Sequence, residues 1–516
     1  MWPELRSRLE SGPLPGGLIL IILVLSYTVY LIGLGIYRVY FSPLAKFPGP
    51  RLAALTSWYQ AYYDIWLGGQ FFKKCDELQK IYGPIIRVNP HEVQVFDPEF
   101  IDTLYTSNSQ RRDKYKWTGR SILLPESLVA TEPHDLHRKR RAALSPFFSK
   151  ASIRRLEEPI QETLAAILAR MKTASKSVEV MPMSLIYKAA TSDIITKYAF
   201  GNSTDYVNRK DYNVGFFEAV DANFGMAWPM THIPWLGPLM NSIPPSVMGI
   251  VYPGLKSLWQ MHHQWTKQIK EIDATKSNND GPHSTIFHGI LSSSLPPSEK
   301  EPARLRQEAQ LVILAGQDTT ANPDKLAKLK EELVAALPDP DTVPTLAVVE
   351  KLPYLNAVIQ EGLRMHPGAL VRMTRVAPDN ELVYNDKTSG QKWVIPKNTP
   401  ITMTALPIQM NEKIFPDPTK FEPERWLENP RLDRYLLTFS KGSRICLGFH
   451  LAYSELYIIL AGLFRKYDLY DGTGRQKTPT IDLYDTVRER DIDAVIDLIV
   501  PYPAKGSKGL RVVVRE

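Results

Sequence analysis

The residue with the clearest chemical potential is Cys446, which lies in the run FSKGSRICLG at residues 439–448. Gly442 and Gly448 flank this cysteine, and residues without a side chain let backbone N–H groups approach the sulfur and stabilise a thiolate. Arg444 lies two positions before Cys446 and can neutralise a carboxylate. One thiolate cannot complete a zinc site, but it can be the single protein ligand of haem iron. A nucleophilic cysteine and a structural cysteine in a tight turn are the alternatives.

This run resembles the haem-binding signature of the cytochrome P450 family, Phe-x-x-Gly-x-Arg-x-Cys-x-Gly, with every fixed position present. The resemblance implies a haem b whose iron is bound axially by Cys446. It also implies the following contacts to the cofactor: Phe439, Gly442, Arg444 and Gly448. The fold that goes with it is mostly α with small β-sheets, the haem-thiolate fold of cytochrome P450.

Two further segments match the same family and supply one acid and two arginines. Glu361 and Arg364 are three residues apart, so a helix places them on one face. Arg425 lies in the run FEPERW at residues 421–426. A lone Glu-x-x-Arg pattern occurs by chance about once or twice in a chain of this size. With the second segment beside it, the resemblance implies a structural network of Glu361, Arg364 and Arg425 near the haem.

A basic run, HRKRR at residues 137–141, matches the family's helix that contacts the haem propionates. The resemblance implies that His137 and Arg141 bind these carboxylates. A solvated basic helix face is the alternative for the three residues between them, 138–140.

Residues 315–320, AGQDTT, end an apolar helical run and resemble the family's oxygen-binding segment. The resemblance implies that Gly316 opens the helix wall over the iron and contacts the cofactor. Asp318 and Thr319 are then the catalytic pair that relays protons to bound dioxygen. An acid and a threonine at a helix end are also ordinary capping residues, so this interpretation depends on the cysteine loop.

The chain departs from the family directly after this segment. Asn322 followed by Pro323 and Asp324 has the order of an N-cap, a first helical position and an acidic first turn, so a new helix is expected to start there. The oxygen-binding helix must then end near Ala321, because a residue before proline avoids the helical region. By resemblance, about twenty residues typical of the family are missing.

Apolar spacing and turn residues predict the elements that position these groups. A helix is expected at 71–82, stopped by Gly83 and Pro84, and a hairpin is expected from strands at 85–88 and 93–96. Further helical patterns lie at 153–171, 308–320, 325–337, 355–365 and 451–463. Two more short strands are expected near 392–395 and 401–404.

Residues 18–37 carry no charge, and as a helix they span roughly 30 Å, the thickness of a bilayer core. This length predicts an uncleaved transmembrane anchor after an N-terminal tail at 1–17. Residues 38–50 form a linker that ends in the stiff run FPGP. We expect residues 51–516 to form one haem-thiolate monooxygenase domain. A slight excess of basic residues after the span favours a cytosolic domain at the endoplasmic reticulum, with the sequon at Asn202 unmodified.

Composition excludes several classes of protein. With 44% hydrophobic and 23% charged residues among 516, global disorder is excluded. The net charge is +7, but no Lys/Arg block is long enough to dominate a surface, so nucleic acid is not an expected partner. Two cysteines, Cys75 and Cys446, cannot build a disulfide framework. No dinucleotide fingerprint or phosphate loop follows a predicted strand, so electrons must come from another protein.

Together these features predict a membrane-anchored monooxygenase that acts on an apolar small molecule. The resemblance implies an NADPH-cytochrome reductase as partner, attracted to a basic face that includes Lys441 and Arg444. The runs at 140–149 and 439–448 look like filamentous-fungal members that act in secondary metabolism, which implies a terpenoid or polyketide-derived substrate. Two alternatives stay open: a non-catalytic or impaired haem protein, and an oxygen-independent haem-thiolate isomerase or dehydratase.

Overall fold

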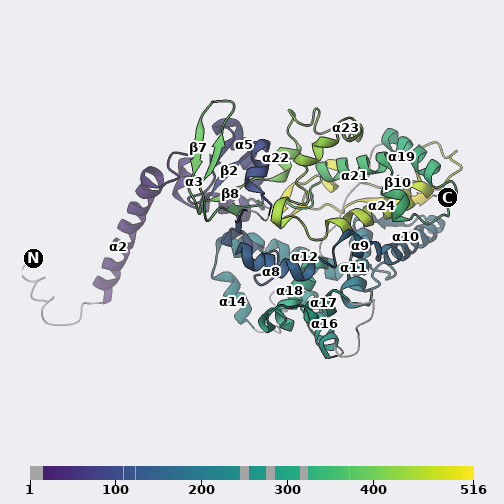
Figure 1. Ribbon diagram of the computed structural model, residues 1–516, viewed down its shortest axis with the longest axis horizontal. Coiled ribbons are helices and arrows are strands. Elements are labelled where there is room, and N and C mark those ends of the chain that lie inside the picture. Colours follow the sequence, from purple (N-terminus) through teal and green to yellow (C-terminus); the bar gives the residue numbers. More distant parts are fainter. Residues whose placement is uncertain are drawn as a thin grey trace, which may run out of the picture.

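Helices dominate the computed structural model, which describes residues 16–107, 110–121, 124–243, 255–274, 285–313, 323–370 and 372–515. The predicted class, mostly α with small sheets, is confirmed. The N-terminal helix α2 (Gly16–Ile36) projects away from the body, at the end where the sheet strands β2, β7 and β8 lie (Figure 1). Short helical segments lead from α2 into the body: η1 (Tyr37–Phe41), α3 (Arg51–Leu55), α4 (Trp58–Ala61) and η2 (Tyr62–Trp66).

A five-stranded sheet near the anchor has the strand order β1-β2-β8-β5-β3. Its strands are β1 (Ile85–Arg87), β2 (Val93–Val95), β3 (Asp113–Lys114), β5 (Arg375–Val376) and β8 (Pro400–Thr402). β1 and β2 are antiparallel, which confirms the predicted hairpin. β3 and β5 are also antiparallel, and their register pairs Lys114 with Arg375. This pairing brings together two basic residues that are far apart in the sequence.

The other strands form three smaller sheets in the described part of the chain. One has the order β4-β13-β10-β9, with bounds β4 (Val180–Pro182), β13 (Arg511–Arg515), β10 (Thr480–Leu483) and β9 (Asp468–Leu469). The remaining pairs are β6 (Leu382–Asn385) with β7 (Lys392–Ile395), and β11 (Ile496–Leu498) with β12 (Val500–Tyr502).

The helix predicted at 71–82 is present as α5 (Phe71–Tyr82). Its apolar residues Phe71, Cys75 and Leu78 recur at helical spacing and are buried together. Gly83 ends the helix with a φ of +93°, a conformation that side chains disfavour, and Pro84 follows.

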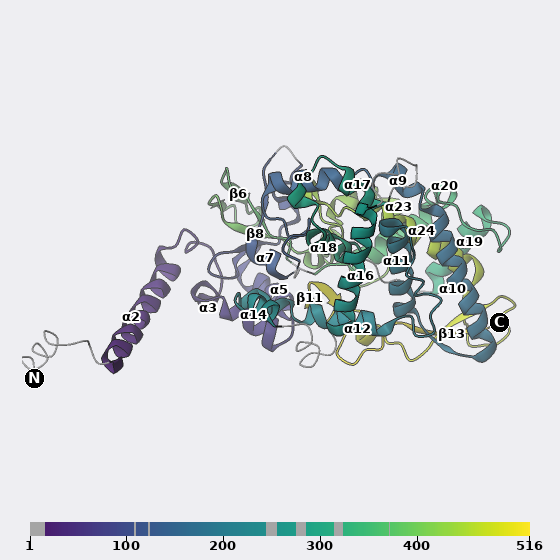
Figure 2. The same cartoon turned by 90° about the horizontal axis from the view of Figure 1, so that it is seen from below.

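The main core lies among the helices at the far end of the body from α2 (Figure 2). The principal ones are α8 (His134–Leu144), α10 (Glu157–Ser177), α11 (Met183–Phe200), α18 (Pro302–Ile313), α21 (Pro353–Met365) and α24 (Phe449–Lys466). α10 and α24 approach so closely that a Cβ on Gly462 would lie 2.4 Å from a methyl group of Leu164. Shorter or peripheral helices complete the fold: α6 (Ile101–Leu104), α7 (Lys116–Ser121), α9 (Lys150–Arg154), α12 (Val214–Gly225), α13 (Ala227–His232), α14 (Leu236–Ser242), α16 (Leu255–Ala274), α17 (Ile286–Ser292), α19 (Pro323–Ala336), α20 (Leu346–Val349), α22 (Ala405–Gln409), α23 (Glu424–Glu428) and α25 (Arg488–Asp491).

The prediction of one continuous helix at 153–171 is wrong. The structure divides it between α9 and α10, with Arg155 in a tighter turn whose N–H donates to the carbonyl of Ser152. The cause is Pro159, because its ring would clash with the carbonyl of Arg155 in a continuous helix and it has no N–H to donate. In the first turn of α10 the same proline is tolerated.

The helices on either side of the shortened segment are described, but the segment itself is not. α19 begins at Pro323, as the capping residues predicted. α18 begins at Pro302, six residues before the predicted start, and is described as far as Ile313. Gly316, Asp318 and Thr319, together with the predicted end of that helix, lie outside the described residues.

Candidate functional site

The cysteine loop is a tight structure held by backbone hydrogen bonds. The N–H of Cys446 donates to the carbonyl of Phe439 over 2.8 Å, which closes the loop, and α24 begins three residues later at Phe449. Gly442 has a φ of +69°, and a Cβ there would lie 2.2 Å from the carbonyl oxygen of Thr106. The loop therefore requires glycine at position 442 for both its conformation and its packing.

The electrostatic environment of the Cys446 thiol combines opposing effects. Burial raises the pKa of this thiol, while the backbone N–H of Gly448 and the guanidinium of Arg141 lower it. Arg141 also donates to the carbonyl of Ile445 over 2.7 Å, so α8 and the cysteine loop are joined directly beside the sulfur. A metal ion at the sulfur would favour the thiolate outright.

Five basic side chains from four segments meet beside this loop: Lys114, His137, Arg141, Arg375 and Arg444. Their hydrogen-bond partners among the described residues are neutral; for example, Arg444 donates to the carbonyls of Thr131 and Glu132, and Lys114 to that of Val129. Within the described residues none of the five forms an ion pair with a carboxylate.

The pKa values show how unfavourable this arrangement is for the protein alone. Burial and the neighbouring arginines lower the pKa of Lys114 well below its usual value, and that of Arg444 to about 9. The same causes lower the pKa of His137 to about 2. Buried positive charges are normally paired. A group that brings carboxylates, as the two propionates of haem would, fits this cluster.

The loop itself also fits such a group. Phe439, Ile445 and Leu447 are apolar, yet each is only half-buried, as is Cys446. The rings of Phe439, in the loop, and Tyr453, in the first turns of α24, have centres 5.6 Å apart. A flat apolar cofactor bound through Cys446 would cover these side chains.

Glu361 is the centre of a buried network below the loop. Arg364 donates two hydrogen bonds of 2.8 Å to its carboxylate, and Arg425 donates one of 3.1 Å. Trp426 adds a hydrogen bond of 2.9 Å from its indole N–H. The structure therefore brings the three predicted members together, and it adds Trp426.

Gln409 connects this network to the cysteine loop. Its side-chain N–H donates to the carbonyl of Arg364 over 2.7 Å, and its side-chain oxygen accepts from the N–H of Leu437 over 2.7 Å. Thr438 donates to the carbonyl of Leu363 over 2.6 Å. The start of the loop is thereby fixed to the end of α21.

The sequence interpretation missed several members of this site. Lys114, Arg375 and Gln409 carry no local signal, because each acquires its role through contacts with residues far along the chain. Trp426 lies in the run FEPERW, but its hydrogen bond to Glu361 was not predicted. On α8, the alternative of a solvated face holds for Arg138 and Lys139, which are exposed. It is wrong for Arg140, which is buried and forms a bidentate pair with Glu299.

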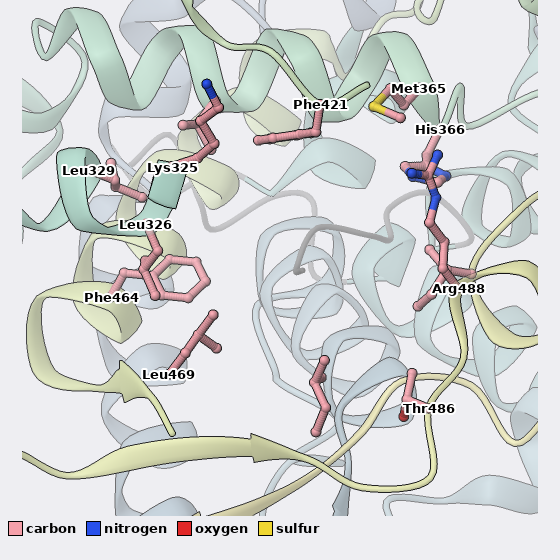
Figure 3. Close-up of a pocket in the computed structure, with 13 residues that line it drawn as sticks. Lys325, Leu326, Leu329, Met365, His366, Phe421, Phe464, Leu469, Thr486 and Arg488 are labelled. Atoms are coloured by element: carbon pink, nitrogen blue, oxygen red, sulfur yellow. The ribbon is translucent and has the colours of Figure 1, made fainter. Parts of the chain in front are cut away.

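An apolar cavity of about 120 Å³ lies elsewhere, between α19, α21 and α24. Figure 3 shows Leu326, Leu329 and Phe464 on one side of it, and Met365 and His366 on the other. None of the predicted site residues that the structure describes lines this cavity, so it is separate from the cysteine loop.

Comparisons with known proteins agree with the geometry. The model of the cytochrome P450 family matches residues 48–487. The chain is 39% identical to cytochrome P450 monooxygenase tpcC of Cochliobolus heterostrophus, over 99% of each chain. It is 38% identical to cytochrome P450 monooxygenase astB of Talaromyces wortmannii, over 96% of this chain and 98% of the relative. It is 35% identical to N-acetyltryptophan 6-hydroxylase ivoC of Emericella nidulans, over 96% of each. This chain belongs to the cytochrome P450 family and is a monooxygenase, an enzyme related to those of fungal secondary metabolism.

Proposed function

We propose that the enzyme inserts one oxygen atom from dioxygen into an apolar small molecule, with Cys446 as the axial ligand of its haem. The observation that carries the proposal is the cluster of five basic side chains beside the cysteine loop, which has no carboxylate partner in the described part of the chain. We propose a terpenoid or polyketide-derived substrate from the resemblance of the runs at 140–149 and 439–448 to filamentous-fungal members. Two relatives whose names give a substrate act instead on tryptophan and N-acetyltryptophan, so an aromatic amino-acid derivative is the alternative.

Each part of the site has a distinct task. The haem, when bound through a thiolate, supplies the activation of dioxygen. The Cys446 sulfur donates electron density to the cofactor, and the N–H of Gly448 together with Arg141 holds its negative charge. The five basic groups fix the propionates, and the Glu361 network keeps the start of the loop in place.

Proton delivery belongs to Asp318 and Thr319 in this proposal. An acid and an alcohol in water-poor surroundings can pass protons to dioxygen. Both residues lie outside the described part of the chain, so their role depends on the match of the run AGQDTT to the family.

The electrons come from a membrane-bound NADPH-cytochrome reductase in this proposal. Of the two basic residues expected to attract it, Arg444 points inward to backbone carbonyls and Lys441 is half-buried. Arg138 and Lys139 are exposed on α8, which carries His137 and Arg141 on its buried side. A docking face on α8 would place the reductase next to the haem edge.

The N-terminal helix supports attachment of the enzyme to a membrane. The helical stretch Gly16–Phe41 contains an 18-residue window with a mean hydropathy of 2.5 and is long enough to cross a bilayer. We propose a cytosolic body at the endoplasmic reticulum. Protease added outside sealed microsomes should then digest the body, whereas protection of the body or a glycan on Asn202 would reverse the topology.

An impaired enzyme is the second candidate, and the start of α19 favours it. This helix begins at Pro323, so only Ala321 and Asn322 separate it from the run AGQDTT, where by resemblance the family has about twenty further residues. Haem retention without oxygen consumption would indicate such an impaired form.

Replacement of the thiolate tests the proposal directly. The variant Cys446→Ser should keep the fold but lose the carbon monoxide difference band that reduced thiolate-bound haem gives, because a hydroxyl is a much weaker electron donor. The variant Cys75→Ser, which changes the buried cysteine of α5, is the matched control and should keep the band. A band of full height in Cys446→Ser would refute the assignment.

A further inference from the structure

The cavity between α19, α21 and α24 is a space that the proposed haem site does not use. Its volume of about 120 Å³ approaches that of an engineered apolar cavity, about 150 Å³, which binds benzene. Most of its wall is apolar and includes Leu326 and Leu329 of α19, Phe464 of α24, and Phe421. A single aromatic ring matches this volume, and the two phenylalanine rings offer it aromatic contacts.

The cavity lies close to the surface of the protein. Leu483, the last residue of β10, lines the cavity and is 39% exposed, and Thr486, which also lines it, is partly exposed. The route from solvent is therefore short, and it does not pass the cysteine loop.

One polar ring in the cavity wall has no partner. The imidazole of His366, which follows α21, forms no hydrogen bond with any residue in the described part of the chain. Burial lowers the pKa of His366 to about 4; Asp493 opposes this shift, and Arg488 and Arg364 add to it. The ring is therefore neutral at pH 7, with one donor and one acceptor nitrogen. A hydroxyl group in the cavity would satisfy one of these nitrogens.

The charged side chains at the cavity already have partners. Lys325 lies 2.6 Å from the carboxylate of Glu422, and Arg488 lies 3.1 Å from that of Asp493. Figure 3 shows Arg488 beside His366, across the cavity from Leu326 and Phe464. A ligand therefore meets apolar walls, compensated charges and one free imidazole, which together favour an uncharged molecule.

The cavity also borders the buried network of Glu361. Val358 and Met365 of α21 line the cavity, and Glu361 lies on the same face of this helix, three residues after the first and four before the second. Phe421 precedes Glu422, whose backbone N–H donates to Glu361 over 2.9 Å. A ligand in the cavity would thus pack against both segments that hold this carboxylate.

We propose that this cavity binds a small uncharged phenol, with its ring against Phe421 and Phe464 and its hydroxyl hydrogen-bonded to His366, and that binding stabilises the Glu361 network. The site itself rests only on the cavity and its walls. The effect of the ligand on haem retention rests on the proposed function.

The first test measures binding with 4-fluorophenol as the probe. Full-length holoenzyme in nanodiscs is saturated with clotrimazole, an azole that occupies the haem iron, and fluorine NMR then gives the bound fraction of the probe. Empty nanodiscs correct for uptake by lipid. Wild type should bind the probe. Leu329→Trp, which fills the cavity, should weaken binding about tenfold or more, because two groups cannot share one close-packed volume.

Val334→Trp is the matched control, since this valine lies on the same helix, α19, and is 43% exposed. It should bind 4-fluorophenol as wild type does. Equal binding by wild type, Leu329→Trp and Val334→Trp would overturn the proposal, and so would the absence of binding to wild type.

The second test isolates the hydrogen bond by comparing 4-fluorophenol with fluorobenzene, which has no hydroxyl. His366→Leu should weaken binding of 4-fluorophenol about fivefold, because one hydrogen bond contributes roughly that factor, and should leave fluorobenzene binding unchanged. This comparison also decides the site if Leu329→Trp fails to fold. An equal effect on both probes, or on neither, would overturn the role of His366.

The third test measures haem retention in enzyme without clotrimazole. At about ten times its dissociation constant, 4-fluorophenol should slow transfer of haem to apomyoglobin by up to about tenfold in wild type, by mass action, but not in Leu329→Trp. Slowing in both chains, or in neither, would overturn the stabilising effect. A chain that binds no haem refutes the proposed function instead, and titration of that chain with the two fluorinated probes still decides the site.

Discussion

A cluster of basic side chains that has no carboxylate partner in the described part of the chain is the most informative feature at the scale of single residues. Lys114, Arg375 and Arg444 are brought into one cluster by a strand pairing and by the cysteine loop. Their mutual repulsion opposes folding of the haem-free protein, and haem carboxylates would remove it. Binding of the cofactor and stability of the fold are therefore coupled.

The variant Lys114→Gln separates the effect of this charge on the stability of the haem-free protein from its effect on haem binding. The haem-free variant should unfold at a higher temperature than wild type, because one buried like charge is gone. The same variant should lose haem to an acceptor such as apomyoglobin about tenfold faster, because a charged hydrogen bond to a propionate is lost. The exposed Lys139→Gln on α8 should change neither quantity. If Lys114→Gln lowers the unfolding temperature of the haem-free and the haem-bound protein equally, Lys114 is only a packing residue.

A buried acid on α24 gives the stability a pH dependence. Burial raises the pKa of Glu455 to about 8, and its Oε1 has no hydrogen-bond partner among the described residues. The unfolded chain ionises at the ordinary glutamate pKa, near 4.5, so the folded state binds more protons between these values. Stability should fall as pH rises from about 4.5 to about 8 and then level off.

Glu455→Gln should remove this slope. Relative to wild type, the free energy of unfolding of the variant should gain on the order of 3 kcal/mol between pH 5 and pH 8, as measured by urea denaturation. Glu412→Gln, which changes an exposed glutamate, is the control and should follow wild type. Parallel curves for wild type and Glu455→Gln would contradict the raised pKa.

Among the elements, we propose that the short helices after the N-terminal helix combine a structural role with contact to the membrane. α4 and η2 bury Gln60 and Asp64, while Trp58 and Trp66 on the same segment are 65% and 82% exposed. Large exposed aromatic side chains next to a membrane-spanning helix indicate a surface that rests on the bilayer.

A chain without residues 1–41 should therefore remain partly bound to lipid vesicles. Trp58→Ser and Trp66→Ser together in that shortened chain should weaken vesicle binding by about tenfold or more per residue, since each indole contributes apolar burial. Val334→Ser with Val343→Ser, two exposed valines elsewhere on the body, is the matched control. If the double tryptophan variant and the double valine variant lose vesicle binding equally in a flotation assay, the tryptophans do not mark a specific membrane-binding surface.

For the molecule as a whole, the decisive question is the length of the chain between α18 and α19. A helix that ends early leaves its last carbonyls without helical partners, and water can then reach the reacting centre. The residues that we propose to hold the haem and its cysteine loop, Glu361, Arg364, Arg425 and Cys446, all follow this point in the sequence. In the chain with the shortened segment, haem binding should therefore be less impaired than catalytic turnover.

We expect the native transcript to encode an additional segment between Thr320 and Asn322. Sequencing of the transcript checks this directly. A form with the segment restored should couple NADPH oxidation to product, whereas the 516-residue form should release more peroxide. Equal coupling in the two forms would show that the shorter chain is complete.

The sequence by itself determined the features whose causes are local. Gly83 and Pro84 ended α5, Pro323 began α19, and the spacing of the cysteine loop identified the family, because turn residues and helical periodicity act over a few positions. Only the tertiary structure decided which distant residues meet. Arg141 contacts the loop 304 positions later, and His232 meets Asp64 across 168 positions. Strand register and helix packing bring these distant residues together. The local sequence around a basic residue does not show whether its side chain faces water or a carboxylate. Lys139 faces water, whereas we propose that Lys114 faces a haem carboxylate.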